Sequence, residues 1–315
     1  TADIRLSDPD GNTVASLQGV ATGTPCTLPV NAPELWSPEH PYLYDLNITL
    51  SSEGQQTDAV KSYCGMRKIE VKNVDGTPRI FLNDTQIFQM GPLDQGWWPD
   101  ALNTAPSDEA LLFDIKAMKE LGFNMIRKHI KVEPSRWYMH CDREGILVWQ
   151  DLPSPNLPAG HEAFARQNFE EEAVRIIDAF ENHPSIVQWV VFNEGWGQFD
   201  TERMTQVVID KVSPQSRVCC ASGWNDAEIG DIKDSHSYPY PSCPIDQKRA
   251  CVNGEYGGIT LKVPGHIWPG GDFGYTAVET PEDFTVMFND LADKIKDHYY
   301  YGLNAAVYTQ LSDVE

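Results

Sequence analysis

From residue 85 onward the sequence repeats one pattern: a short apolar run, a polar loop and a segment with helical periodicity. Strands that alternate with helices pair in parallel through right-handed crossovers, which restricts the fold to the α/β class. Eight such units between residues 85 and 315 fit a (β/α)8 TIM barrel whose last helix is missing. The eight predicted strands are 87–91, 124–129, 146–150, 186–192, 217–222, 232–235, 250–254 and 305–308.

Five segments between these runs have the spacing and the end signals of helices. The first begins after Ser107, carries Asp108 and Glu109 in its first turn and ends at Gly122. A serine cap, an acidic first turn and a terminal glycine are typical of stable helix ends. An open doubly wound sheet is the alternative fold, but no G-x-G-x-x-G stretch follows the first predicted strand. The other predicted helices are 134–144, 164–183, 201–212 and 282–300.

Residues 1–70 follow a different pattern, in which turn-forming clusters at 8–12, 29–33 and 51–54 separate short stretches. Residues 42–50 alternate between apolar and polar side chains, as a half-buried strand does. This region is predicted to be part of an antiparallel β-sandwich, too short for a complete one. We therefore expect two domains, a partial sandwich over 1–70 and a barrel over 71–315.

The charge of the chain limits the partners that it can have. Its 46 acidic and 24 basic residues give a formal net charge of −22. Such a surface repels phosphate backbones and anionic lipids, so we expect no nucleic-acid or membrane partner. Runs of about 18 apolar residues, which a membrane span needs, do not occur. The seven cysteines show no C-x-x-C spacing, and we expect neither a metal nor a cofactor.

Polar residues gather where the predicted strands end, and in a TIM barrel those ends face the active site. Two carboxylates stand out: Glu194 follows the fourth strand, and Glu255 follows the seventh, nearly opposite across the barrel mouth. Cleavage of a glycosidic bond needs one protonated and one ionised carboxyl group, and two acids in one cleft have separated pKa values. Glu194 and Glu255 are therefore the predicted catalytic pair.

Further residues near strand ends are predicted to contact a carbohydrate substrate. Asn193 can bind a sugar hydroxyl, and the cation of Arg127 can keep Glu255 ionised. Indole rings offer flat apolar faces to sugar rings. The predicted substrate-binding residues are Asn193, Arg127, His129, Asp151, Trp196, His236, Tyr238, Trp268 and Trp98.

Several stretches resemble glycoside hydrolase family 2, which contains β-galactosidases, β-glucuronidases and β-mannosidases. Residues 182–194 (NHPSIVQWVVFNE) resemble its acid/base signature, and residues 254–257 (GEYG) resemble its nucleophile motif. Residues 33–44 and 65–67 resemble the end of the immunoglobulin-like domain that precedes its barrel. The resemblance covers nearly the whole chain. It implies a TIM barrel preceded by part of an immunoglobulin-like β-sandwich.

The resemblance also implies residue roles in a retaining, double-displacement mechanism. Glu194 would be the acid/base, and Glu255 would be the nucleophile that forms a glycosyl-enzyme intermediate. Asn193 would contact the 2-hydroxyl group of the sugar. Arg127 matches an arginine at the end of strand two, and Tyr238 matches a strand-six tyrosine that hydrogen-bonds the nucleophile.

The sequence departs from the family pattern at several positions. Phe192 stands where glycine is frequent, residues 128–131 (KHIK) replace Ser-His-Tyr-Pro, and Tyr308 or Thr309 replaces a strand-eight tryptophan. The Asn-x-Lys pair with which glucuronidases bind the uronate does not occur, which favours neutral sugars. The family's amino-terminal sugar-binding domain is also missing. We therefore expect other domains of the same polypeptide as partners, and the compartment stays open.

The resulting hypothesis is a cofactor-independent retaining exo-β-glycosidase for neutral sugars, β-galactosidase-like, with its carboxyl groups about 5–5.5 Å apart. One alternative is a catalytically inactive carbohydrate-binding fragment. Another is a family-2 enzyme of other specificity, a β-mannosidase or β-glucuronidase. A third is a metal-dependent barrel hydrolase with its ion at His129, His236 and Asp151, although their spacing is not diagnostic.

Overall fold

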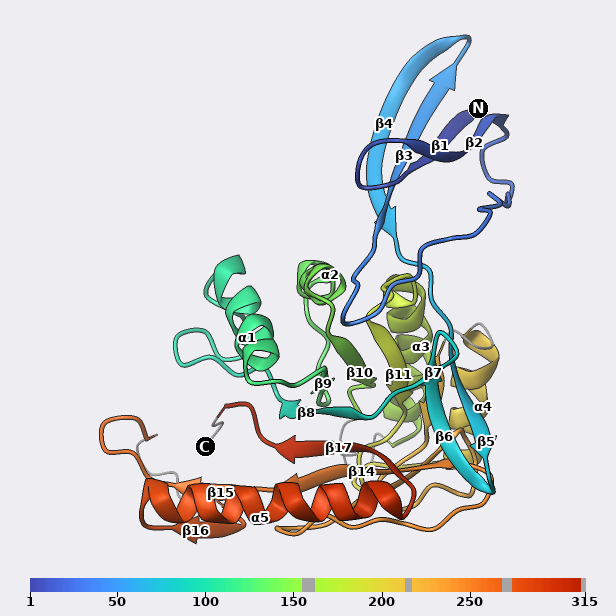
Figure 1. Cartoon of the computed structure of the whole chain (residues 1–315). Helices are drawn as coiled ribbons and strands as arrows, with labels where there is room; N and C mark the ends of the chain where they lie inside the picture. Colours follow the sequence, from blue (N-terminus) through green and yellow to red (C-terminus); the bar gives the residue numbers. More distant parts are fainter. Residues whose placement is uncertain (155–161, 213–216, 268–273, 313–315) are drawn as a thin grey trace.

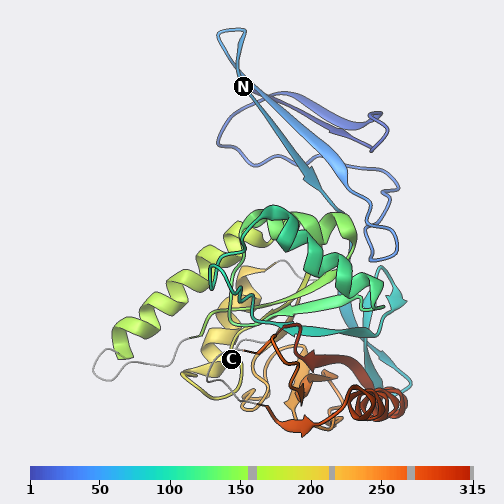
Figure 2. The ribbon, with the colours of Figure 1, turned by 90° about the vertical axis from the view of Figure 1, so that its left-hand side faces the viewer.

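The computed structural model describes residues 1–154, 162–212, 217–267 and 274–312. Its first part is a four-stranded antiparallel sheet that projects from the side of the remaining structure (Figures 1 and 2). The sheet has the order β2-β1-β3-β4, and β1 pairs with both β2 and β3. Its strands are β1 (Ala2–Ser7), β2 (Thr13–Val20), β3 (Tyr44–Ser52) and β4 (Gln55–Cys64).

The second part is an eight-stranded parallel barrel, which confirms the predicted TIM fold. Its ladder runs β12-β11-β10-β9-β8-β17-β14-β13, so chain order is kept around the barrel. The two ends of the ladder, β12 and β13, meet at a seam where Cys220 and Gly230 form an antiparallel bridge. The strands are β8 (Gln89–Asp94), β9 (Met125–Lys128), β10 (Leu147–Asp151), β11 (Ile186–Val190), β12 (Val218–Cys220), β13 (Ile232–His236), β14 (Ala250–Gly257) and β17 (Leu303–Thr309).

The helices that the structure describes lie where the sequence predicts them. Ser107 caps the first helix by accepting the amide hydrogen of Ala110, and Thr280 caps the last by accepting that of Asp283. The last helix packs on β14 and β17 (Figure 1). Among these helices, none combines the length and the apolar composition that crossing a membrane requires. They are α1 (Asp108–Glu120), α2 (Ser135–Glu144), α3 (Glu162–Phe180), α4 (Thr201–Lys211) and α5 (Pro281–Tyr300).

A small sheet that the sequence analysis did not identify closes the amino end of the barrel. It consists of β5 (Ile69–Val74), β6 (Thr77–Leu82) and β7 (Thr85–Gln86). Its Ile69 and Ile80 are fully buried and pack with Leu147 and Val187, which lie at the amino ends of two barrel strands. The apolar interior is therefore sealed at this end, and the carboxyl ends of the strands are left to form a site.

The four-stranded sheet is joined to the barrel through the buried carboxylate of Asp142 on α2. Its Oδ2 accepts from the hydroxyl of Tyr63 on β4 at 2.7 Å and lies 2.6 Å from Nδ1 of His183. Its Oδ1 accepts the backbone N–H of Ser185 at 2.9 Å. Trp36 donates its indole N–H to the backbone carbonyl of Asp142 at 2.8 Å. Sheet, helix and barrel thus share one hydrogen-bonded junction.

Candidate active site

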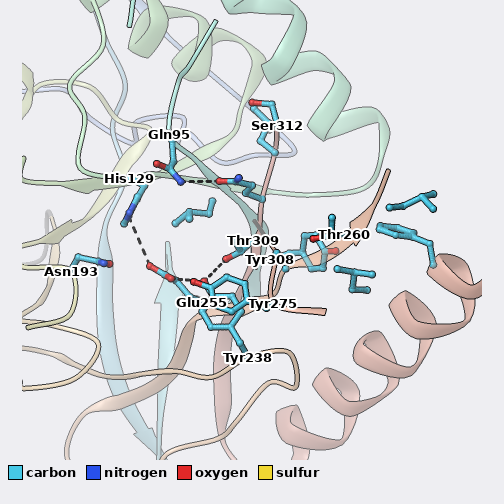
Figure 3. Close-up of a pocket in the computed structure, with 18 of the residues that line it drawn as sticks. Gln95, His129, Asn193, Tyr238, Glu255, Thr260, Tyr275, Tyr308, Thr309 and Ser312 are labelled. Carbon is cyan, nitrogen blue, oxygen red and sulfur yellow. Dashed lines mark hydrogen bonds and ion pairs between the residues drawn. The ribbon is translucent and has the colours of Figure 1, made fainter. Parts of the chain in front are cut away.

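A cavity of about 580 Å³ opens at the carboxyl ends of the barrel strands (Figure 3). Its wall includes Asn193 and Glu194 after β11, Tyr238 after β13, and Glu255 in β14. This is the end of a TIM barrel where active sites form, and the volume is within the usual range for small-molecule sites. The cavity therefore brings the predicted catalytic pair into one space.

The two carboxylates, Glu194 and Glu255, face each other across a histidine. Nδ1 of His236 lies 2.8 Å from Oε1 of Glu194 and 3.5 Å from Oε1 of Glu255. One oxygen of each carboxylate lies within 4.8 Å of an oxygen of the other. This separation is close to the roughly 5–5.5 Å of retaining glycosidases and shorter than the roughly 6.5–9.5 Å of inverting ones.

Arg127 is the fully buried centre of the site. Its Nε and Nη2 donate to the two oxygens of Asp151 at 3.1 and 2.9 Å. Its Nη1 donates to Oε1 of Glu255 at 3.2 Å, and its Nη2 to Oδ1 of Asn193 at 2.8 Å. Burial by itself would lower the pKa of Arg127, but the charges of Asp151 and Glu255 raise it above its usual value. The guanidinium stays charged and fixes both Glu255 and Asn193.

Tyr238 binds the other oxygen of Glu255. Its hydroxyl donates to Oε2 at 2.5 Å and lies 2.8 Å from Oγ1 of Thr309 (Figure 3). The ring of Tyr275 stacks on that of Tyr238 with the centroids 3.6 Å apart. Burial and the negative charge of Glu255 raise the pKa of Tyr238, so its proton stays in place. Glu255 thus receives hydrogen bonds on both oxygens.

His236 carries a positive charge against Glu194. Burial disfavours that charge, but the carboxylates of Glu255 and Asp234 raise the pKa of His236 to about 10. Burial likewise raises the pKa of Glu194, but the hydrogen bond from His236 and its charge outweigh this, and the net shift is downward. Asp234 lies 3.3 Å from Nε2 of His236 and was not among the predicted residues. Its position two residues before His236 on β13, hence on the same face, is the signal that could have identified it.

The remaining predicted residues differ in where they lie. His129 lines the cavity, 3.1 Å from Asp151 and 4.0 Å from Oε1 of Glu255. The indole N–H of Trp196 donates to Oε2 of Glu194 at 3.3 Å. Trp98 packs instead against the core between the barrel and its outer helices and does not line the cavity. Trp268 lies outside the described residues.

The metal hypothesis does not fit the arrangement of its three residues. Arg127 lies 2.9 Å from Asp151 and 3.4 Å from Nε2 of His236. The guanidinium group therefore occupies the position between these side chains that a metal ion would need. Within the described ranges, the cluster with ligand spacing is Glu194, His236 and Glu255. In that cluster Nδ1 of His236 is already paired with Oε1 of Glu194 at 2.8 Å. These residues are arranged for charge pairing among themselves.

Family models match both parts of the chain. The model for glycosyl hydrolases family 2 matches residues 1–67, and the model for the TIM barrel domain of that family matches residues 103–256. The chain belongs to glycoside hydrolase family 2. This agrees with the barrel and with the resemblance of the two sequence signatures.

Family-2 relatives of two named activities are similarly close to the chain. A β-galactosidase of Halalkalibacterium halodurans is 31% identical over 61% of the chain, and a β-glucuronidase of Bacteroides fragilis is 28% identical over 62%. The aligned segments make up 20% and 30% of these relatives. The chain thus spans a minor part of the length of the curated family-2 proteins that it matches.

Solved family-2 structures share the fold. The β-glucuronidase of Ruminococcus gnavus in complex with D-glucuronic acid superposes over 100% of the chain and 57% of its own, with a TM-score of 0.79 and 18% identity. β-Glucuronidase 3 of Bacteroides uniformis covers 98% of the chain and 43% of its own, with a TM-score of 0.73 and 17% identity. At this identity the likeness concerns architecture and leaves the substrate open.

Proposed function

We propose that this chain carries the active site of a retaining exo-β-glycosidase that hydrolyses the O-glycosidic bonds of neutral sugars. The observation that carries the proposal is the approach of the carboxylates of Glu194 and Glu255 to within 4.8 Å inside one cavity. Family membership supports a glycosidase. On the side of the cavity opposite Asn193, a wall that includes Thr260 and Tyr275 suits a terminal sugar (Figure 3).

In the first step Glu255 attacks the anomeric carbon while Glu194 gives its proton to the leaving oxygen. The hydrogen bonds from Arg127 and Tyr238 hold Glu255 in one orientation for attack. A covalent glycosyl-enzyme forms, and the aglycone leaves. In the second step Glu194 takes a proton from water, whose oxygen displaces Glu255. Two inversions at the same carbon give net retention of configuration.

The proton of Glu194 is held jointly with His236. With Glu194 ionised and His236 protonated, the pair contains one proton in the hydrogen bond between Nδ1 and Oε1. Bound substrate excludes water, which disfavours the two separate charges and favours the neutral pair. Glu194 then carries the proton that the leaving oxygen needs.

The charges in the cavity wall favour a neutral sugar. Among the cavity-lining residues that the structure describes, none is lysine or arginine, whereas Glu194 and Glu255 both contribute carboxylates. A uronate would meet these two carboxylates without a lysine or arginine among the described lining residues to pair with. A galactoside, which is neutral, avoids this cost. A β-glucuronide is the second candidate substrate, because a relative named β-glucuronidase is about as similar to this chain as the one named β-galactosidase.

A panel of nitrophenyl β-galactoside, β-glucoside, β-mannoside and β-glucuronide tests the proposal. We expect turnover to be highest on a neutral glycoside and to fall at least 10³-fold, about 4 kcal/mol, in Glu255→Ala. Azide should restore turnover of that variant and give a glycosyl azide of inverted configuration. Glu172→Ala, which removes an exposed carboxylate on α3, is the matched control.

The same panel separates the alternatives. Highest turnover on the glucuronide would assign the second candidate. Binding of a glycoside by calorimetry without turnover of any would indicate the inactive carbohydrate-binding protein. Activity of Glu255→Ala at the wild-type level would remove the assignment of the nucleophile.

A further inference from the structure

Two exposed indole rings lie beside Glu194, outside the cavity. Trp196, two residues after Glu194, is 65% exposed, and Trp224, in the loop after β12, is 55% exposed. Their ring centroids are 5.8 Å apart, and the rings are inclined at 57°. Neither ring belongs to the cavity wall, whereas Glu194 does. Glu194 therefore stands between the cavity on one side and the indole pair on the other.

Hydrogen bonds link the loops that carry the two rings, and each ring has a contact of its own. Oγ of Ser222 accepts the backbone N–H of Trp224 at 3.2 Å and donates toward the backbone carbonyl of Asn193 at 3.4 Å. The ring of Trp224 lies so close to Gly195 that a Cβ there would touch it at 3.5 Å. The indole N–H of Trp196 is fixed on Glu194. The loops after β11 and β12 thus form one preorganised unit, which lowers the entropy that binding costs.

We propose that Trp196 and Trp224 form the subsite for the leaving group, and that this subsite selects a leaving group with a flat apolar face. The proposal rests on the glycosidase function proposed above, in which Glu194 protonates the leaving oxygen. The group attached to that oxygen must pass Glu194 as it extends out of the cavity, and the indole pair is what it meets. Two sources supply such a face: an aryl group, and the C–H face of a second sugar ring.

Trp224 provides the cleaner test, because its ring contacts that of Trp196, whereas the hydrogen bond to Glu194 comes from Trp196. With the sugar that is turned over best, we expect Trp224→Ala to lower kcat/KM about 3- to 10-fold for the phenyl glycoside and for a disaccharide, about 0.6–1.4 kcal/mol. The glycosyl fluoride, which has no ring in its leaving group, should be hydrolysed at the wild-type rate. Loss on only one of the two ring substrates identifies the source.

Trp196→Ala should show the same selectivity and additionally lose the hydrogen bond to Glu194. Trp196→Phe retains a ring without the N–H and should recover most of the loss on the phenyl glycoside. Tyr300→Ala, which removes an 80% exposed ring from α5, is the matched control and should change none of these rates. Equal losses on the fluoride and the phenyl glycoside in Trp224→Ala would overturn the subsite, because they would place the effect on the catalytic pair.

A binding measurement keeps the test independent of turnover. Calorimetric titration with phenyl and methyl β-galactoside, and with the corresponding glucuronides, should give a 3- to 10-fold preference for phenyl that Trp224→Ala removes. If no glycoside is hydrolysed but this preference is present, the hydrolase function fails and the subsite remains. Equal affinity for phenyl and methyl glycosides in both pairs would overturn the subsite whether or not the protein is a hydrolase.

Discussion

At the scale of the residue, one guanidinium sets the geometry of the site. Arg127 comes from β9 and reaches Asp151 at the end of β10, Asn193 after β11 and Glu255 in β14. A rigid planar fork with five N–H donors can fix several acceptors at once, which an ammonium cannot do with the same geometry. The reacting carboxylate and the sugar-binding amide are therefore held relative to each other.

The pairing of His236 with Glu194 has a consequence for the pH profile. Because the pKa of His236 is about 10, the pair keeps one proton well into the alkaline range. In His236→Asn, Glu194 alone must hold it, and we expect the alkaline limb of kcat/KM to fall at lower pH, by on the order of 2 pH units. A pH profile of both proteins measures this shift.

Ser237→Ala is the control for that experiment. Ser237 follows His236 directly, and its hydroxyl bonds Ser242. Its profile should match the wild type. An alkaline limb that moves upward in His236→Asn would mean that His236 only depresses the pKa of Glu194 and supplies no proton.

A second titrating group, Asp114, makes the free energy of unfolding depend on pH. Burial, with the negative charge of Asp94 adding to it, raises the pKa of Asp114 on α1 to about 6. The folded protein therefore binds this proton more tightly than the unfolded chain, and its contribution to stability is lost as the pH rises from about 4 through 6. We expect Asp114→Asn to be about 1–2 kcal/mol more stable than wild type at pH 8 and similar at pH 4, by urea unfolding.

Glu120→Gln, at the exposed end of the same helix, controls for the loss of a negative charge. Its difference from wild type should be the same at both pH values. Equal stability of wild type and Asp114→Asn at pH 8 would show that the carboxylate of Asp114 is ionised without cost.

The sequence predicts site residues well where a charged side chain stands at the end of a predicted barrel strand. Glu194, Glu255 and Arg127 end predicted strands, and the structure brings all three together. Trp98 also stands in a loop after a strand, but sequence position does not show which way a large apolar ring turns. Its ring is partly buried against the core and does not line the cavity. Trp224 was missed because nothing in the loop after β12 separates its ring from an ordinary surface residue.

At the scale of the element, barrel strands and helices can be predicted from the sequence by two different signals. Parallel strands buried on both faces are continuous apolar runs, and helices show a period of 3.6 together with caps. The sheet β5-β6-β7 lacks both signals, since its strands are not continuous apolar runs and follow directly on the region assigned to the sandwich. This sheet is the plug that closes the amino end of the barrel, and that role depends on contacts with strands far along the chain.

The plug should contribute to stability through its buried apolar side chains. Ile80 is fully buried among the barrel-interior residues. We expect Ile80→Ala to lower the free energy of unfolding by about 2–4 kcal/mol, since the cavity that it leaves cannot collapse fully. Val74→Ala, at the exposed end of β5, should cost less than about 0.5 kcal/mol. Equal effects of the two changes in urea unfolding would argue that the plug is not part of the core.

At the scale of the whole molecule, Asp142 connects the amino-terminal sheet to the barrel. Replacement by Ala leaves the Ser185 N–H, His183 and Tyr63 without their acceptor. We expect a loss of about 3 kcal/mol for Asp142→Ala and about 1 kcal/mol for Tyr63→Phe, measured by urea unfolding. A loss in Asp142→Ala no larger than in Tyr63→Phe would contradict a shared junction.

The seam between β12 and β13 gives the barrel one compliant side. β13 has a parallel ladder only with β14, whereas β9 has one on each side, and β13 carries His236. We expect the amides of β13 to exchange with deuterium faster than those of β9, because opening the seam breaks fewer hydrogen bonds. Strand β13, and with it His236, can then shift each time a sugar enters or leaves the site. Strand β9, which carries Arg127, keeps its position.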